Sequence, residues 1–142
     1  VALVATDCWF MDAAGHRGGT FFGRTPFPDG DPYRALLTGS NFLASPTLMF
    51  RIPVVLCQSD LRYAELFDLC VEVAKYAPIA ALPQVLASYR VHPGNRGGTG
   101  CLGMTKEVLA IMRRHRAGAP WSQHVRELVL SARYGWQALA HS

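Results

Sequence analysis

The sequence predicts an α/β fold, an incomplete mixed sheet followed by a helical C-terminal tail. Residues 1 to 11 are rich in β-forming side chains, residues 60 to 76 have a helical apolar pattern, and β-forming residues return at 79 to 91. Strands and helices mix without the even alternation of a complete doubly wound domain. We therefore expect strands that would complete the sheet to be missing.

One domain is expected over residues 1 to 142, because a chain of 142 residues, 50% of them hydrophobic, can bury one core but not two ordinary ones. Within it, residues 1 to 103 form the α/β part and residues 104 to 142 form the tail. The chain begins without Met, directly in a strand-like run. This favours a piece of a longer protein.

The first strand runs from Val1 to Met11, and a turn at Asp12 to Gly15 leads to a second strand at Thr20 to Phe22. The segment from Gly23 to Gly39 contains three prolines and three glycines, which is typical of a surface loop. One turn of helix is expected within it, at Tyr33 to Leu37.

The middle of the chain predicts a strand from Ser40 to Ile52, interrupted at Pro46 because proline lacks the donor that a sheet needs. Ser59 is a candidate N-cap for a helix from Asp60 to Tyr76, which Pro78 ends.

Four polar residues share one narrow face of this helix, at spacings of three, four and three: Glu65, Asp68, Glu72 and Lys75. A stripe of this kind is more often a solvated helix face. The alternative is that a carboxylate near a buried helix start is a general base.

After this helix, strands are predicted at Ile79 to Leu82 and Gln84 to Val91, followed by the Gly-rich loop "HPGNRGGTG". A basic helix is expected from Lys106 to Ala117, and a last helix from Ser122 to about Ala140.

The basic cluster Arg113 to Arg116 contributes to a net charge of +4. A solvated helix face is the simpler interpretation, whereas phosphate, nucleic acid or peripheral membrane contact is the alternative. No aromatic residues interleave with the arginines as a base-stacking surface requires, so no nucleic-acid partner is predicted.

The four cysteines lack CxxC spacing and a nearby histidine that would complete a zinc site, so buried thiols are expected at Cys8, Cys57, Cys70 and Cys101. No run reaches the roughly 18 apolar residues of a membrane span, and "VALVA" lacks the basic flank of a signal peptide. The default expectation is a cytoplasmic protein.

Polar residues also gather where strands end. Arg90 and His92 are two residues apart and face the same side of a strand, with Asn95 in the loop beyond. Such a pair can bind phosphate, a metal or a proton, although an ion-paired edge strand is the plainer alternative. "TGSN" at Thr38 to Asn41 is another polar segment of this kind.

The hairpin, "LLTGSNFLASPTLMFR", a helix with Glu near its start and "LPQVLASYRVHPGN" follow one another in the order of a known family. Together they resemble the second half of a family 2 inverting glycosyltransferase with the GT-A fold, over about residues 1 to 100. The resemblance implies transfer of a sugar from a nucleotide diphosphate donor to an acceptor hydroxyl, with a divalent metal (Mn or Mg) in the full-length parent.

The resemblance also assigns roles to residues. Leu66 stands where the family has its base, so either Glu65 or Asp68 takes that role, or the usual reaction does not occur. The substrate-binding residues that it implies are Gly39, Asn41, Arg90, His92 and Asn95. His92 would also lie beside the metal.

The family's donor-binding half, with its DxD-type acids, has no counterpart in this sequence. The 142-residue chain is therefore expected to be inactive alone, to bind no metal by itself and to self-associate through an exposed strand edge or apolar face. The alternative function is a non-catalytic binding or assembly module derived from a glycosyltransferase.

Overall fold

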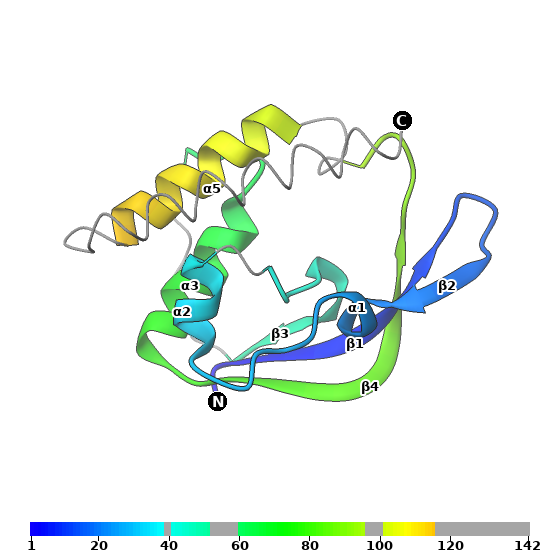
Figure 1. Ribbon diagram of the computed structural model, residues 1–142, viewed down its shortest axis with the longest axis horizontal. Coiled ribbons are helices and arrows are strands. Elements are labelled where there is room, and N and C mark those ends of the chain that lie inside the picture. The colour runs from blue at the N-terminus through cyan, green and yellow to red at the C-terminus, as the bar shows by residue number, and fades with distance from the viewer. Residues whose placement is uncertain (39–40, 52–59, 96–100, 116–142) are drawn as a thin grey trace.

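The computed structural model describes residues 1–38, 41–51, 60–95 and 101–115. The fold is α/β, with α2, α3 and α5 layered on one side of a four-stranded sheet (Figure 1). In chain order the elements are β1 (Leu3–Met11), β2 (Arg17–Thr20), α1 (Phe21–Arg24), α2 (Pro32–Leu37), η1 (Ser45–Thr47), β3 (Leu48–Phe50), α3 (Glu65–Tyr76), β4 (Ile79–Arg90) and α5 (Cys101–His115).

Strand β1 is the centre of the sheet, and most of its residues are buried. β4 pairs with it in parallel from Leu3 to Met11 and so occupies one edge over its whole length. The other edge is shared by two antiparallel strands: β3 pairs with Leu3 to Ala5, and β2 pairs near Trp9 and Met11. The sheet is therefore mixed, as expected.

Strand β4 is continuous where the sequence predicts two strands. Leu82 pairs with Thr6 and Val85 pairs with Asp7, so Pro83 and Gln84 fall in a shift of register. Proline has no backbone N–H to donate to a neighbouring strand, but residues in a bulge do not need this donor. The strand can therefore continue through Pro83.

The predicted second strand of the hairpin is present as β2, but its predicted bounds, Thr20 to Phe22, are wrong, because the strand runs from Arg17 to Thr20 and the chain turns into α1 at Phe21. The Thr20 side chain accepts a hydrogen bond from Gly23 N (3.2 Å), and the buried Asp7 carboxylate accepts one from Phe22 N (2.9 Å). These two side-chain acceptors satisfy backbone N–H groups at the start of the helix. The two phenylalanines are β-forming residues, so the sequence pattern favours a strand at this point.

The predicted helical turn at Tyr33 to Leu37 is confirmed as α2, which Asp31 caps and Pro32 begins. By contrast, the predicted long strand from Ser40 to Ile52 is reduced to η1 and the short β3. Pro46 lies inside η1, where its fixed φ suits a helical turn better than a strand.

Helix α3 begins at Glu65, later than the predicted Asp60, and α5 begins at Cys101, earlier than the predicted Lys106. Ser59, the predicted cap, and the predicted helix from Ser122 to Ala140 lie outside the described residues.

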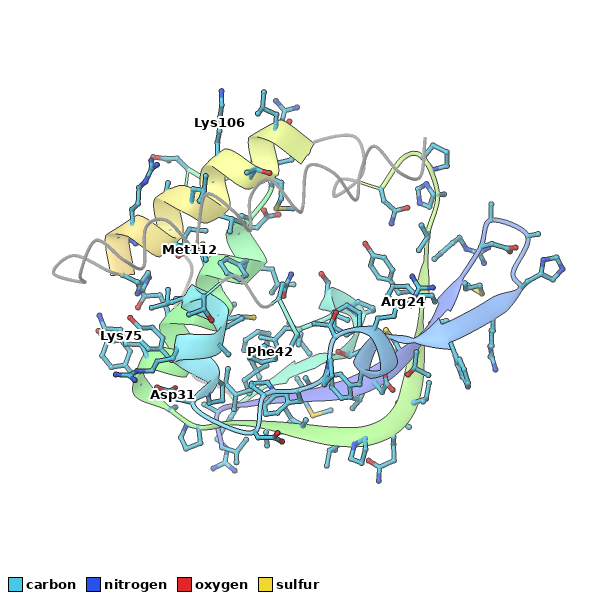
Figure 2. All side chains as sticks on the ribbon, viewed as in Figure 1. Arg24, Asp31, Phe42, Lys75, Lys106 and Met112 are labelled. Carbon is cyan, nitrogen blue, oxygen red and sulfur yellow. The ribbon has the colours of Figure 1, made fainter. Side chains whose placement is uncertain are left out.

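The core lies between the helices and the sheet. Figure 2 shows Phe42 and Met112 pointing into it, whereas Lys106 points away from it on the outer face of α5. The Phe42 ring packs edge-on against Phe27, with 5.0 Å between ring centroids. The core cluster consists of Leu3, Ala5, Leu36, Leu37, Phe42, Leu43, Ala64, Cys70, Val71, Ile79, Ile111 and Met112.

Two of the predicted buried thiols, Cys8 and Cys70, are confirmed as buried. Burial and the neighbouring Asp7 charge raise the pKa of Cys8, because both disfavour the thiolate. Cys57 lies outside the described residues. Among the helices that the structure describes, none has the length and apolar character needed to cross a bilayer.

Candidate functional site

The start of α3 is held by a carboxylate from another helix. Ala64, the N-cap residue, has no side chain that can cap, and Glu107 of α5 takes that role. Its carboxylate accepts hydrogen bonds from the backbone N–H groups of Arg62 (3.0 Å), Tyr63 (2.8 Å) and Ala64 (2.9 Å).

The electrostatics of Glu107 agree with this capping role. Desolvation disfavours the charged form, but the three backbone hydrogen bonds outweigh it and lower the pKa of Glu107. This contact could not be predicted from the sequence, because a single Glu in a basic helix is ordinary and its partners are 43 to 45 residues away.

Glu65 is the first residue of α3, and its Oε2 atom is buried. The next residue, Leu66, packs against the hydrophobic core. The leucine at the position expected for the base therefore has a packing role. A carboxylate in its place would lose part of its hydration by burial against apolar side chains.

The acids further along the stripe face α5 and do not form a solvated surface. Asp68 is 3% exposed and forms an ion pair with Arg114. Glu72 Oε1 lies 3.2 Å from His115 Nε2 and 3.9 Å from Arg114 Nη2. Asp68 and Glu72 thus attach α5 to α3, and a catalytic role for Asp68 stays a prediction.

Arg90, at the end of β4, contacts the hairpin turn between β1 and β2. Its Nη1 donates to the backbone oxygens of Asp12 (3.1 Å) and Ala13 (2.9 Å). The guanidinium therefore ties β4 to this turn, and the bonds use only one of its three nitrogens.

His92 and Asn95 form a closed turn after β4. Asn95 Oδ1 accepts from His92 N (2.6 Å), and Asn95 Nδ2 donates to the oxygens of Tyr89 (3.3 Å) and Arg90 (3.0 Å). His92 Nδ1 accepts from Gly94 N (3.1 Å), so Nε2 is the nitrogen left for a proton or a ligand.

The described parts of the chain do not supply a ligand set around His92. Among these residues, no three His, Cys, Asp or Glu side chains gather closely enough to hold a metal ion. A metal-binding role for His92 therefore stays a prediction.

Asn41 is exposed, and its Oδ1 accepts a hydrogen bond from Leu43 N (3.3 Å). This contact shapes the segment that leads to η1. Gly39, the other predicted acceptor-side residue, lies outside the described residues.

Most of the candidate residues lie in two regions. Asp68 belongs to the α3–α5 interface, which we define by Asp68, Glu72, Glu107, Arg114 and His115, and Glu65 is the first residue of α3, beside it in sequence. Arg90, His92 and Asn95 belong to the carboxyl end of β4. In Figure 1 the start of α3 lies beneath α5, whereas β4 ends near the hairpin.

Comparisons with models of protein families, with curated proteins and with solved structures found no match to this chain. The function is therefore argued from the geometry of these two regions.

Proposed function

We propose that this chain supplies the acceptor-side and catalytic-helix part of a glycosyltransferase. A sugar would pass from a nucleotide diphosphate donor to an acceptor hydroxyl with inversion. The observation that supports the proposal best is the place of Glu65, which is the first residue of the helix that follows β3 and precedes β4 in the chain. A carboxylate fixed on a rigid element can accept the proton that the hydroxyl must lose.

Glu65 is assigned as the base in preference to Asp68. The Asp68 carboxylate is 3% exposed and paired with Arg114, so a proton transfer to it would disrupt a buried ion pair. Glu65 lies one turn earlier, beside the helix start that Glu107 holds in place.

Arg90 and His92 are assigned to the donor side. The hydrogen bonds that attach Arg90 to the hairpin turn come from Nη1, and a guanidinium has five donors with which to bind a phosphate as well. A divalent cation would neutralise the leaving diphosphate in the longer parent. Among the described residues, no three His, Cys, Asp or Glu side chains gather to hold it.

The test is sugar transfer by the longest gene product that contains this chain, with Glu65→Gln as the decisive variant. Removing a general base is expected to slow transfer by a factor of about 10²–10⁴. Glu72→Gln is the matched control, because Glu72 lies on the same helix but faces α5. Equal rates for Glu65→Gln and the unmodified protein would reject this assignment.

The second candidate is a non-catalytic binding or assembly module. It is favoured by Leu66, which packs in the core at the expected base position, and by the structural contacts of Asp68 and Arg90. Calorimetric titration of the same gene product with nucleotide sugars and Mn separates the two. Donor binding with turnover supports the enzyme, whereas a folded protein without either supports the module.

A further inference from the structure

His115, near the C-terminal end of α5, joins three helices. Its side chain is 2% exposed. The Nε2 atom lies 3.2 Å from Glu72 Oε1 of α3, and Nδ1 lies 3.4 Å from the hydroxyl of Tyr33 on α2. The rings of His115 and Tyr33 also meet edge-on, with 6.0 Å between centroids.

One of the two neutral tautomers satisfies both neighbours. With its proton on Nε2, neutral His115 donates to Glu72 and accepts from the Tyr33 hydroxyl at Nδ1. Protonation at Nδ1 reverses the second hydrogen bond, so that the Tyr33 oxygen must accept it, and places a full charge on a ring that is 2% exposed. It also creates a second positive charge beside Arg114, whose Nη2 lies 3.4 Å from His115 Nε2.

Charged groups of both signs face this ring. The titratable and charged neighbours are Asp68, Glu72 and Lys75 of α3, Arg114 of α5 and Tyr33 of α2. Burial is the largest influence and lowers the pKa of His115; Glu72 and Asp68 oppose this, and Arg114 and Lys75 reinforce it. The net result is a lowered pKa, so the ring is neutral near pH 7.

We propose that His115 is a pH-sensitive latch, which holds the end of α5 against α2 and α3 when neutral and weakens that contact when protonated. The latch does not depend on the proposed enzymatic function. It bears on the candidate site because α5 also carries Glu107, the cap of the α3 start.

The sign follows from linkage. A histidine in an undocked α5 has a pKa of about 6.5, whereas the docked ring has a lower one. Above about pH 7 both states are neutral and docking is at full strength. As the pH falls from about 6.5 toward the lower pKa, the undocked state takes up the proton first, and docking weakens up to tenfold for each pH unit.

Amide hydrogen exchange at pH 7.5 and 5.5, corrected for intrinsic rates, tests the latch on the unmodified protein, His115→Gln and His16→Gln. Glutamine can donate to Glu72 and accept from Tyr33 without titrating. Protection in the last turn of α5 should fall several-fold at pH 5.5 in the unmodified protein and in His16→Gln, whose side chain is 82% exposed, but not in His115→Gln. An equal fall in His115→Gln would overturn the proposal.

An NMR titration of the His115 ring in the unmodified protein gives a second readout that does not need the variant to fold. A pKa below about 6.5 supports the latch. A value at or above about 6.5 overturns it.

Discussion

The α3–α5 interface and the carboxyl end of β4 both contain the charged residues that the sequence singles out, yet they are held in different ways. In the interface, Asp68 is 3% exposed and its ion-pair partner comes from another helix. At the end of β4, Arg90 and His92 are exposed and bond to backbone groups of nearby turns. The first arrangement commits charges to packing, whereas the second leaves side-chain atoms available to a ligand.

The largest effect is expected from Arg114→Ala. It leaves the Asp68 carboxylate buried without its guanidinium, which should lower the free energy of unfolding by about 1–3 kcal/mol. Urea denaturation measures this loss. Arg113→Ala, an exposed neighbour on α5, is the matched control and should change the stability by less than about 0.5 kcal/mol.

Gly103→Ala is expected to come next. A Cβ at Gly103 would lie 2.7 Å from the ring of Tyr63, which precedes α3, so α5 and this segment must shift or the ring must turn. Overpacking of this kind costs about 1–3 kcal/mol. Thermal unfolding should show the loss for Gly103→Ala but not for Gly19→Ala, because nothing lies within 4 Å of a Cβ at Gly19. Equal melting temperatures for the two variants would mean that α5 does not approach α3 this closely.

Glu107→Ala should loosen the first turn of α3, because three backbone N–H groups lose their acceptor. Amide exchange at residues 62 to 64 should accelerate in Glu107→Ala. The exchange rate in Glu107→Gln should lie between those of Glu107→Ala and the unmodified protein, because an amide oxygen still accepts a hydrogen bond but carries no charge. Unchanged exchange would show that water replaces the carboxylate without loss.

The smallest effect on stability is expected from Arg90→Ala, at about 0.5 kcal/mol or less, because its hydrogen bonds to the hairpin turn are exposed. In the proposed enzyme the same change should weaken donor binding, which calorimetry with a nucleotide sugar would detect. A large loss of stability would show that Arg90 mainly stabilises the fold, as the residues of the α3–α5 interface do, and would contradict a ligand-binding role.

Local chemistry accounts for the parts of the fold that the sequence predicts correctly. Asp31 followed by Pro32 begins α2, and the β-forming run ending at Met11 becomes the central strand. The errors occur where side-chain caps or strand pairing override local propensity. Thr20 and Asp7 turn a predicted strand into α1, and a bulge lets β4 continue through Pro83.

The candidate site shows the same limit. Periodicity places Glu65, Asp68 and Glu72 on one stripe of a helix, and α3 confirms that they share an element. Periodicity contains no information about what the stripe faces, because Arg114, His115 and Glu107 come from a helix more than 40 residues away in sequence. Only the packing of α5 on α3 shows that Asp68 and Glu72 hold a helix.

The central claim is that Asp68 and Arg114 are coupled across the α3–α5 interface, so that the acid stripe docks a helix. A double-mutant cycle with Asp68→Asn, Arg114→Ala and the combined variant tests it directly, with the free energy of unfolding measured by urea denaturation. The account predicts a coupling energy of about 0.5–3 kcal/mol, the range for residues in direct contact. Additive effects of the two single changes would contradict it.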